Sequence, residues 1–156
     1  MDKYLYFLRH ATAEVIRPNQ LDIDRCLIEK GRLQARRVAA FMQRHSITVE
    51  TVLSSPYPRA VQTAAIACKE AGFAAASEQA WLALETPTEV AYRHLTEQLT
   101  TLPAHSLLVG HEPDFSALIS RLLGSDTLLL NIRKASLTCV GFSSESGCFE
   151  LQWSIP

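Results

Sequence analysis

The sequence predicts an α/β fold in which helices cover both faces of a mostly parallel sheet. Three observations support this prediction: short apolar runs typical of buried strands, amphipathic segments of helical period between them, and two final strand-like runs separated by a turn. The expected order is strand, helix, strand, helix, helix, strand, helix and hairpin. The predicted architecture is a three-layer α/β/α sandwich with a C-terminal hairpin. The length suits one domain that spans residues 1–156.

The predicted strands are short, and turn or helix signals follow each of them. The apolar and aromatic run from Lys3 to Leu8 predicts the first strand, and residues 11–28 after it predict a loop. The other predicted strands cover residues 51–54, 106–110, 136–142 and 148–154. The last two are separated by Ser-Glu-Ser-Gly, which is typical of a hairpin.

Four predicted helices alternate with these strands. They cover residues 29–44, 56–71 and 86–102, and a fourth begins at Pro113. Gly72 and Gly124 follow the second and fourth helices, at positions where glycine often ends a helix. The residues expected to face the core include Leu33, Val38, Phe41 and Met42 in the first helix, Leu95, Leu99 and Leu102 in the third, and Phe115, Leu118, Ile119 and Leu122 in the fourth.

Composition excludes several classes of function. Fifteen Lys and Arg residues stand against sixteen Asp and Glu, so a net charge of −1 gives no case for nucleic acid. No apolar run approaches the roughly 18 residues of a membrane span, and the first residues lack a signal-type apolar region with a cleavage site. The four cysteines are widely spaced without a CxxC pair, so we expect reduced thiols and no metal site. A cytoplasmic location is the expectation.

Arginine and histidine side chains follow three of the predicted strands at the point where each strand ends. Arg9 and His10 come directly after the first strand, Arg59 lies just beyond the second, and His111 follows the strand at 106–110. Because the carboxyl ends of parallel strands share one edge of a sheet, these residues are expected to converge there. Two of the strands lead into helices, whose N-termini favour anions. The sequence therefore predicts a site for a dianionic phosphate.

Each of these residues has a plainer explanation when it is taken alone. Arg-His pairs arise by chance, His111 suits an ordinary loop histidine, and Arg59 suits a solvated side chain on a first helical turn. Ser55 either binds the phosphate or only forms the turn, and Thr12, with Arg17, is a candidate for the mouth of the site. The convergence at the strand ends is what favours a site.

Three segments together resemble the motifs of the histidine phosphatase superfamily, whose fold is called phosphoglycerate-mutase-like. They are Phe-Leu-Arg-His-Ala at 7–11, Ser-Ser-Pro-Tyr-Pro-Arg-Ala-Val-Gln-Thr-Ala at 54–64 and Val-Gly-His-Glu-Pro at 109–113. Residues 25–35 also resemble the stretch leading into the family's first helix. Two departures are Ala11, where many members have glycine, and Ile28, where threonine often caps the helix. Ala11 implies a negative φ at that position.

The resemblance implies a covalent, metal-independent mechanism without a cofactor. His10 is the expected nucleophile and attacks phosphorus through one neutral ring nitrogen, while the other nitrogen keeps its proton against an acceptor such as a backbone carbonyl. Arg9, Arg59 and His111 are expected to bind the phosphoryl oxygens, where charge is spread in the transition state. A substrate phosphoryl group would rest on His10 until water removes it.

A carboxylate is expected to protonate the leaving group when the substrate is an ester. Glu85, just before Thr86-Pro87, is the candidate for this general acid, and Glu89 competes with it. Either carboxylate could instead serve only as a favourable charge at a helix start. A phosphohistidine substrate relaxes the need for an acid, because imidazole is a better leaving group than an alkoxide.

The length of the chain indicates how large a substrate the site could admit. Only about 35 residues separate the second helix from the strand at 106–110, which leaves little room for a cap and resembles the SixA-type phosphohistidine phosphatases. This resemblance implies an open site, a phosphorylated protein as the partner and a role in signal transduction. The alternatives are a phosphatase for a small phosphomonoester and a phosphate-binding module without turnover.

Overall fold

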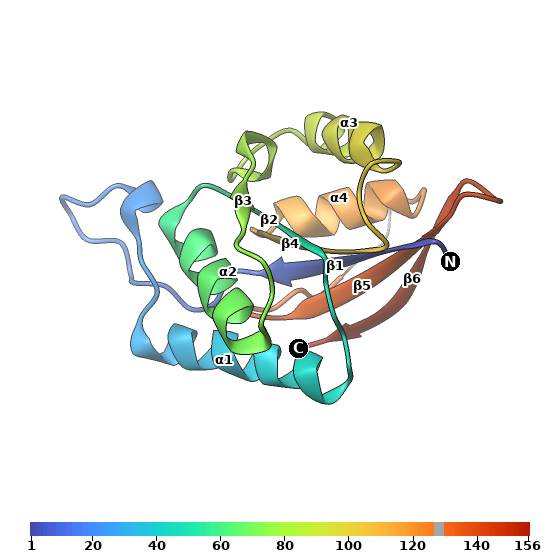
Figure 1. Cartoon of the computed structure of the whole chain (residues 1–156). Coiled ribbons are helices and arrows are strands. Elements are labelled where there is room, and N and C mark those ends of the chain that lie inside the picture. Colours follow the sequence, from blue (N-terminus) through green and yellow to red (C-terminus); the bar gives the residue numbers. More distant parts are fainter. Residues whose placement is uncertain (127–129) are drawn as a thin grey trace.

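The protein forms a six-stranded sheet with helices on both faces, as the computed structural model shows (Figure 1). The structure describes residues 1–126 and 130–156. The elements in chain order are β1 (Lys3–Arg9), η1 (Asp22–Asp24), α1 (Glu29–Arg44), β2 (Thr51–Ser54), α2 (Pro58–Ala71), β3 (Ser77–Glu78), η2 (Ala80–Leu82), α3 (Thr88–Gln98), β4 (His105–Gly110), α4 (Asp114–Leu122), β5 (Leu137–Ser143) and β6 (Cys148–Ile155).

The sheet has the strand order β3-β2-β4-β1-β5-β6. The first four of these strands run parallel, whereas β5 pairs antiparallel with β1 and β6 pairs antiparallel with β5. Figure 1 shows α1 and α2 on one face of the sheet and α3 and α4 on the other. The predicted three-layer α/β/α architecture, its largely parallel sheet and its C-terminal hairpin are therefore confirmed.

Alternate side chains of β1 point to opposite faces of the sheet and pack into two different hydrophobic clusters. Tyr6 and Leu8 belong to the cluster on the α1/α2 face, and Leu5 and Phe7 belong to the cluster on the α3/α4 face. This alternation follows from the period of two along a strand. Because both faces of β1 are covered, the strand is apolar along nearly its whole length, as is typical of a buried parallel strand.

Three neighbouring strands end at the same level. Leu8 and Ser54 both pair with Val109, which lies between them on β4. The pairing continues beyond the strands, where the His10 N–H donates to the Gly110 carbonyl at 2.9 Å and the Ser55 N–H donates to the Val109 carbonyl at 2.9 Å. The residues that follow β1, β2 and β4 therefore emerge together at one edge, which we call the carboxyl edge.

Helix α1 has the predicted bounds, but one residue of its predicted inner face is wrong. Val38 and Met42 are buried and Phe41 is partly buried, whereas Leu33 is exposed. At 100° a residue, Leu33 lies about 140° around the helix from Val38, so one apolar stripe cannot hold both. The buried face of α1 also contains small residues, namely Gly31, Ala35 and Ala39.

The remaining helices are shorter than predicted and keep their buried residues. Helix α2 begins at Pro58 rather than residue 56, and Gly72 ends it with a φ of 76°. Helix α3 covers Thr88–Gln98 within the predicted 86–102, although Leu99 and Leu102 beyond it are buried as expected. Among the helices of residues 1–126 and 130–156, none has the length and apolar character needed to cross a membrane.

The start of α1 packs directly on the segment that follows His10. The Thr12 N–H and hydroxyl both donate to Gln34 Oε1 at 2.9 Å, and the Ile28 N–H donates to the Thr12 carbonyl at 3.2 Å. Gly31 completes this contact, because a Cβ there would lie 2.0 Å from the Thr12 carbonyl oxygen. The backbone of helix α1 therefore lies in close contact with the backbone of the loop after β1, at Gly31 and Thr12.

Replacing Gly31 with alanine is expected to lower the free energy of unfolding by about 2 kcal/mol or more, because the methyl group displaces backbone. The expected loss is opposite in sign to the effect of intrinsic helix propensity, which favours alanine over glycine by up to about 1 kcal/mol. Urea denaturation measures the effect. The control Ala40→Gly, at an exposed position of α1, should lose only about 0.5–1 kcal/mol. A Gly31→Ala variant as stable as the wild type would contradict the close approach.

Candidate active site

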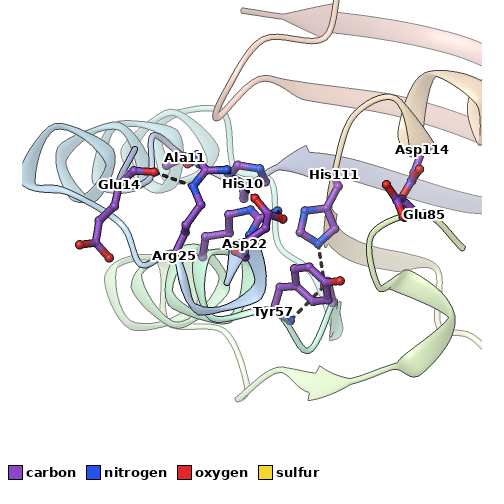
Figure 2. Close-up of polar contacts among 11 residues, drawn as sticks. His10, Ala11, Glu14, Asp22, Arg25, Tyr57, Glu85, His111 and Asp114 are labelled. Atoms are coloured by element: carbon purple, nitrogen blue, oxygen red, sulfur yellow. Dashed lines mark hydrogen bonds and ion pairs between the residues drawn. The ribbon is translucent and has the colours of Figure 1, made fainter. Parts of the chain in front are cut away.

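The carboxyl edge brings two histidines and two arginines together. Arg9 is the last residue of β1, His10 and His111 directly follow β1 and β4, and Arg59 lies in the first turn of α2. The His10 and His111 ring centroids are 5.2 Å apart, and Figure 2 shows the two residues as neighbours at this edge. The convergence predicted from the sequence is present for these four residues.

His10 is held in one tautomer. Its side chain is only 6% exposed, and Nδ1 lies 2.8 Å from the Ala11 carbonyl oxygen. A carbonyl can only accept, so Nδ1 carries the proton and Nε2 keeps its lone pair. Burial lowers the pKa of His10 to about 4, and the charges of Arg59 and Arg9 act in the same direction. His10 is therefore a neutral imidazole with a free Nε2 at neutral pH.

Thr63 fixes the backbone that orients His10. The Ala11 N–H donates to Thr63 Oγ1 at 3.0 Å, and the Thr63 hydroxyl donates to the Arg59 carbonyl at 2.8 Å. Ala11 is fully buried and is not among the residues with positive φ, as its side chain implied. Sequence reasoning assigned Thr63 no role. Its signal was its place in the second motif, four residues and about one helical turn after Arg59.

His111 is also buried, and Ser55 orients it. The Ser55 Oγ lies 2.7 Å from His111 Nε2 and accepts the Tyr57 N–H at 3.2 Å. Burial lowers the pKa of His111 to about 3, so its ring is neutral as well. When the hydroxyl donates its proton to Nε2, the neutral ring of His111 carries its own proton on Nδ1. His111 thereby presents an N–H from its other side.

Three buried nitrogens at this edge have no hydrogen-bond partner within residues 1–126 and 130–156. They are Arg9 Nε, Arg59 Nε and His111 Nδ1. An unpaired buried donor costs about 1–3 kcal/mol, so such donors are rare and call for a functional reason. With two guanidinium charges nearby, these donors suit an anion with several oxygens, as phosphate has.

A carboxylate that sequence reasoning missed reaches the same place. The Asp22 carbonyl and carboxylate accept hydrogen bonds from Arg59 at 2.9 and 3.0 Å, and Arg25 donates to the same carboxylate at 2.9 Å. The pairing with Arg25, and then with Arg59, lowers the pKa of Asp22. Asp22 lies in η1, within the predicted loop 11–28, so this loop lies against the site through Asp22 (Figure 2).

The side chains of the other residues proposed for substrate binding already form polar contacts with neighbouring side chains. The Thr12 hydroxyl donates to Gln34, and the Ser55 hydroxyl contacts His111. Arg17 is exposed and pairs with Glu14 at 3.6 Å. In this arrangement Ser55 acts on the site by orienting His111, while Thr12 anchors the loop to α1.

Glu85, proposed as the general acid, lies on the far side of His111 from His10 (Figure 2). It is exposed with a φ of 69°, and its backbone N–H donates to Asp114 Oδ2 at 2.9 Å. Burial raises the pKa of Asp114, and the carboxylate of Glu85 adds to the rise. Glu89 pairs with Arg121 at 2.7 Å. Asp22, rather than either glutamate, is the carboxylate that contacts a site arginine.

The described part of the chain contains no group of three or more His, Cys, Asp or Glu side chains arranged to hold a metal ion. The positive charge at the carboxyl edge comes from Arg9 and Arg59. Burial lowers the pKa of Arg9, whose guanidinium also donates to the Ile132 carbonyl at 3.0 Å.

The low pKa values of His10 and His111 predict that the free energy of unfolding decreases as the pH is lowered. Both lie below the ordinary value of 6.5, so the unfolded chain binds protons that the folded protein excludes. Their contribution is complete above about pH 6.5 and is lost as pH falls toward the folded values of about 4 and 3. Between pH 7.5 and 5 the expected loss in free energy of unfolding is about 2 kcal/mol for each histidine.

Urea denaturation at the two pH values measures this loss, and the variant His111→Gln isolates one part of it. Glutamine cannot titrate, so the variant should show a shallower dependence on pH than the wild type. Equal slopes for the two proteins would contradict a depressed pKa at His111.

A family model described as histidine phosphatase superfamily (branch 1) matches residues 5–84, which include most of β1, His10 and Arg59. This chain belongs to that superfamily. A protein from Picosynechococcus sp., described as uncharacterised, is 33% identical over 137 residues, which cover 85% of this chain and 81% of that protein. Membership of the histidine phosphatase superfamily supports a phosphatase activity.

Solved structures share the fold of this histidine phosphatase chain. The protein histidine phosphatase SixA, in complex with tungstate, has a TM-score of 0.85 at 21% identity and covers 97% of this chain and 96% of its own. A mycobacterial glucosyl-3-phosphoglycerate phosphatase in complex with VO3 has a TM-score of 0.80 at 18% identity, over 97% of this chain and 98% of its own. At these identities, the similarity establishes the phosphoglycerate-mutase-like fold alone.

Proposed function

We propose that this protein is a phosphohistidine phosphatase that removes the phosphoryl group from a protein histidine through a covalent phospho-His10 intermediate. The observation that carries the proposal is the tautomer of His10. The Ala11 carbonyl keeps the proton on Nδ1, so Nε2 is free at the same edge where the N–H groups of Arg9, Arg59 and His111 have no partner in the described chain. Binding alone has no use for this free nitrogen, which argues against a module without turnover.

The proposed reaction has two displacements at phosphorus. In the first, the His10 Nε2 lone pair forms a bond to phosphorus while the bond to the substrate nitrogen breaks. The electron pair of that bond leaves with the substrate imidazole, which takes up one proton from solvent. Arg9, Arg59 and His111 donate to the phosphoryl oxygens, where negative charge is spread. Hydrogen bonding to the Ala11 carbonyl stabilises the positive charge that His10 gains when it is phosphorylated.

In the second displacement, water attacks phosphorus and His10 Nε2 recovers its electron pair. The water loses one proton to solvent, and inorganic phosphate leaves. Positive charge from Arg9 and Arg59 supplies the electrostatic stabilisation, so the proposed steps call on no metal ion. Asp22 is a positioning residue in this scheme, since it accepts from two of the five Arg59 N–H groups and leaves the others for phosphate.

Two observations favour a protein substrate. Within the described chain, five of the eight large apolar side chains that are exposed belong to the loop 11–28 that contains Asp22: Val15, Ile16, Leu21, Ile23 and Ile28. Exposed apolar residues gathered beside a site are typical of contact with another protein. Second, neither Glu85 nor Glu89 contacts a site histidine or arginine in the part of the chain that the structure describes, as expected for a substrate with a good leaving group.

This proposal covers residues 1–156 as one domain, since all six strands belong to one sheet. The structural relative named for glucosyl-3-phosphoglycerate represents the competing class, the small phosphoesters. A phosphohistidine substrate would place the protein in a cytoplasmic phosphorelay or phosphotransfer system.

The test compares kcat/KM for a histidine-phosphorylated protein with kcat/KM for a series of small phosphomonoesters. We expect the phosphohistidine protein to react faster by at least about tenfold, because its leaving group needs little protonation. A tenfold preference for an ester would overturn the proposed substrate. Phosphate binding without any turnover of either class would identify a binding module instead.

A further inference from the structure

A basic groove runs beside the candidate active site. It has a volume of about 400 Å³ and lies between α1, the end of β6 and the segment that precedes β5. Three cations line it: Arg37 on α1, with Arg133 and Lys134 on that segment. Its apolar surface includes Phe41 and Ile155, and no Asp or Glu of the described chain is among its lining residues. We call this feature the basic groove.

The basic groove is continuous with the backbone of the site. The Ala135 N–H, in the groove wall, donates to the Arg9 carbonyl at 3.1 Å and to the His10 carbonyl at 3.3 Å. Gln34 lines the opposite wall and holds Thr12, two residues beyond His10. Lys134 in the groove lining is also close enough to His10 for its charge to lower the pKa of that histidine. The groove therefore lies near the position of the phosphoryl group.

The charges of the basic groove are available to a partner. Arg37, Arg133 and Lys134 are exposed, and their side chains form no ion pair or hydrogen bond within residues 1–126 and 130–156. By contrast, Arg36, next to Arg37, pairs with Glu29 at 3.8 Å. Helix α1 as a whole carries five basic residues and one acidic residue, although the chain has a net charge of −1. Three cations that have no ion pair in the described chain therefore lie together along the groove itself.

We propose that the basic groove docks an acidic surface of the substrate protein beside its phosphohistidine. The inference rests on the proposed function and adds the chemistry that selects the partner. A groove of this size with an apolar wall suits a peptide segment that carries Asp or Glu with an apolar residue. A nucleic acid would require a longer basic stripe, which the near-neutral net charge of the chain does not favour. Complementary charge of this kind raises association rates and specificity.

The experiment uses two synthetic peptides of equal length, each with one phosphohistidine, flanked either by Glu or by Lys. Wild-type protein at low salt should give a kcat/KM about tenfold higher for the acidic peptide, and added NaCl should reduce this preference by screening. The double variant Arg37→Glu/Arg133→Glu should abolish or reverse the preference. Its kcat/KM for free phosphohistidine should stay within about twofold of wild type, because neither residue contacts the reacting atoms.

A matched control carries the same change of charge elsewhere. Lys69 and Arg93 are exposed on α2 and α3 and outside the groove, so Lys69→Glu/Arg93→Glu should keep the preference for the acidic peptide. Fluorescence anisotropy with the unphosphorylated peptides supplies a second measurement that does not depend on turnover. The acidic peptide should bind the wild type and the control, and bind the groove variant at least about tenfold more weakly.

Three results would overturn docking at the groove: no charge preference in the wild type, a preference that survives in the groove variant, or anisotropy that does not distinguish the two peptides. Inhibition of the wild type by a uridine oligonucleotide, relieved in the groove variant and without any peptide preference, would identify a nucleic-acid surface instead. Failure of the proposed function has a different signature: p-nitrophenyl phosphate is hydrolysed and no phosphohistidine peptide is, whatever the anisotropy gives.

Discussion

Replacing His10 with alanine is expected to lower kcat by at least about 10⁴-fold, since removal of a nucleophile leaves only binding and electrostatic stabilisation. The loss should appear in kcat/KM as well, and no phosphorylated protein should accumulate on the variant. The reason is local, because Ala11 and Thr63 orient this one ring, while burial and the two arginine charges keep it neutral. Steady-state kinetics with the phosphohistidine substrate measures the effect.

The control for this variant is His94→Ala, which removes an exposed histidine of α3. It should keep wild-type kinetics. Circular dichroism and urea denaturation of His10→Ala show whether the fold is intact, so that lost activity is not mistaken for lost structure. A folded His10→Ala variant that kept a tenth of the wild-type kcat would contradict the assignment of the nucleophile.

Removal of the Arg59 side chain has the second largest expected effect. Arg59→Ala should lower kcat/KM by about 10²–10³-fold, as other preorganised transition-state donors do. Arg59 is 2% exposed, and its guanidinium donates to Asp22 with two N–H groups and keeps a buried Nε that has no partner in the described chain. Arg59→Lys restores the charge but not the planar donor set, so it should recover only part of the loss.

Asp22→Ala and Arg93→Ala separate catalysis from positioning in the same assay. Asp22 acts through Arg59, so its removal should cost about tenfold at most in kcat/KM, and the phosphoenzyme should still form at a correspondingly lower rate. Arg93 is exposed and outside the site, and its removal should change nothing. An Arg59→Ala variant with wild-type kcat and KM would refute the role of this guanidinium in binding phosphate.

The sequence was sufficient to predict the convergence of Arg9, His10, Arg59 and His111. The apolar runs before these residues are strands buried on both faces, and parallel strands of this kind end at one edge. The register of β1, β4 and β2 brings those ends to the same level. The apolar pattern of each strand was therefore enough to predict that residues far apart in the sequence meet at one edge. The sequence analysis also predicted that an acceptor such as a backbone carbonyl would hold the proton on one ring nitrogen of His10. In the structure the Ala11 carbonyl lies against Nδ1.

Asp22 could not be found in the same way. Its position depends on how a loop of irregular structure returns to the sheet, through a bridge between Ala13 and Leu27 and the turn at η1. No period in the sequence encodes such a path. The Glu85 assignment rested on its nearness to a helix start, which does not specify the direction of its side chain. The structure shows that the backbone N–H of Glu85 donates to Asp114.

The exposed Leu33 illustrates a different limit. An apolar residue on a predicted helix was assigned inward because it is apolar, although its angle relative to Val38 placed it elsewhere. The face of α1 that is buried contains Gly31 and Ala35, whose small size permits close approach and carries little hydrophobic signal. Close packing through small residues is therefore harder to predict than burial of large ones.

The central claim is that Nε2 of His10 receives the phosphoryl group. The most direct measurement is to quench the protein during turnover under alkaline conditions, map the phosphorylated residue by mass spectrometry, and assign the ring nitrogen by ³¹P and ¹⁵N NMR. We predict one phosphoryl group, on His10, bonded to Nε2, because the Ala11 carbonyl holds the proton on Nδ1. A phosphoryl group on Nδ1 or on another residue, or turnover in which no phosphoenzyme forms, would contradict the account.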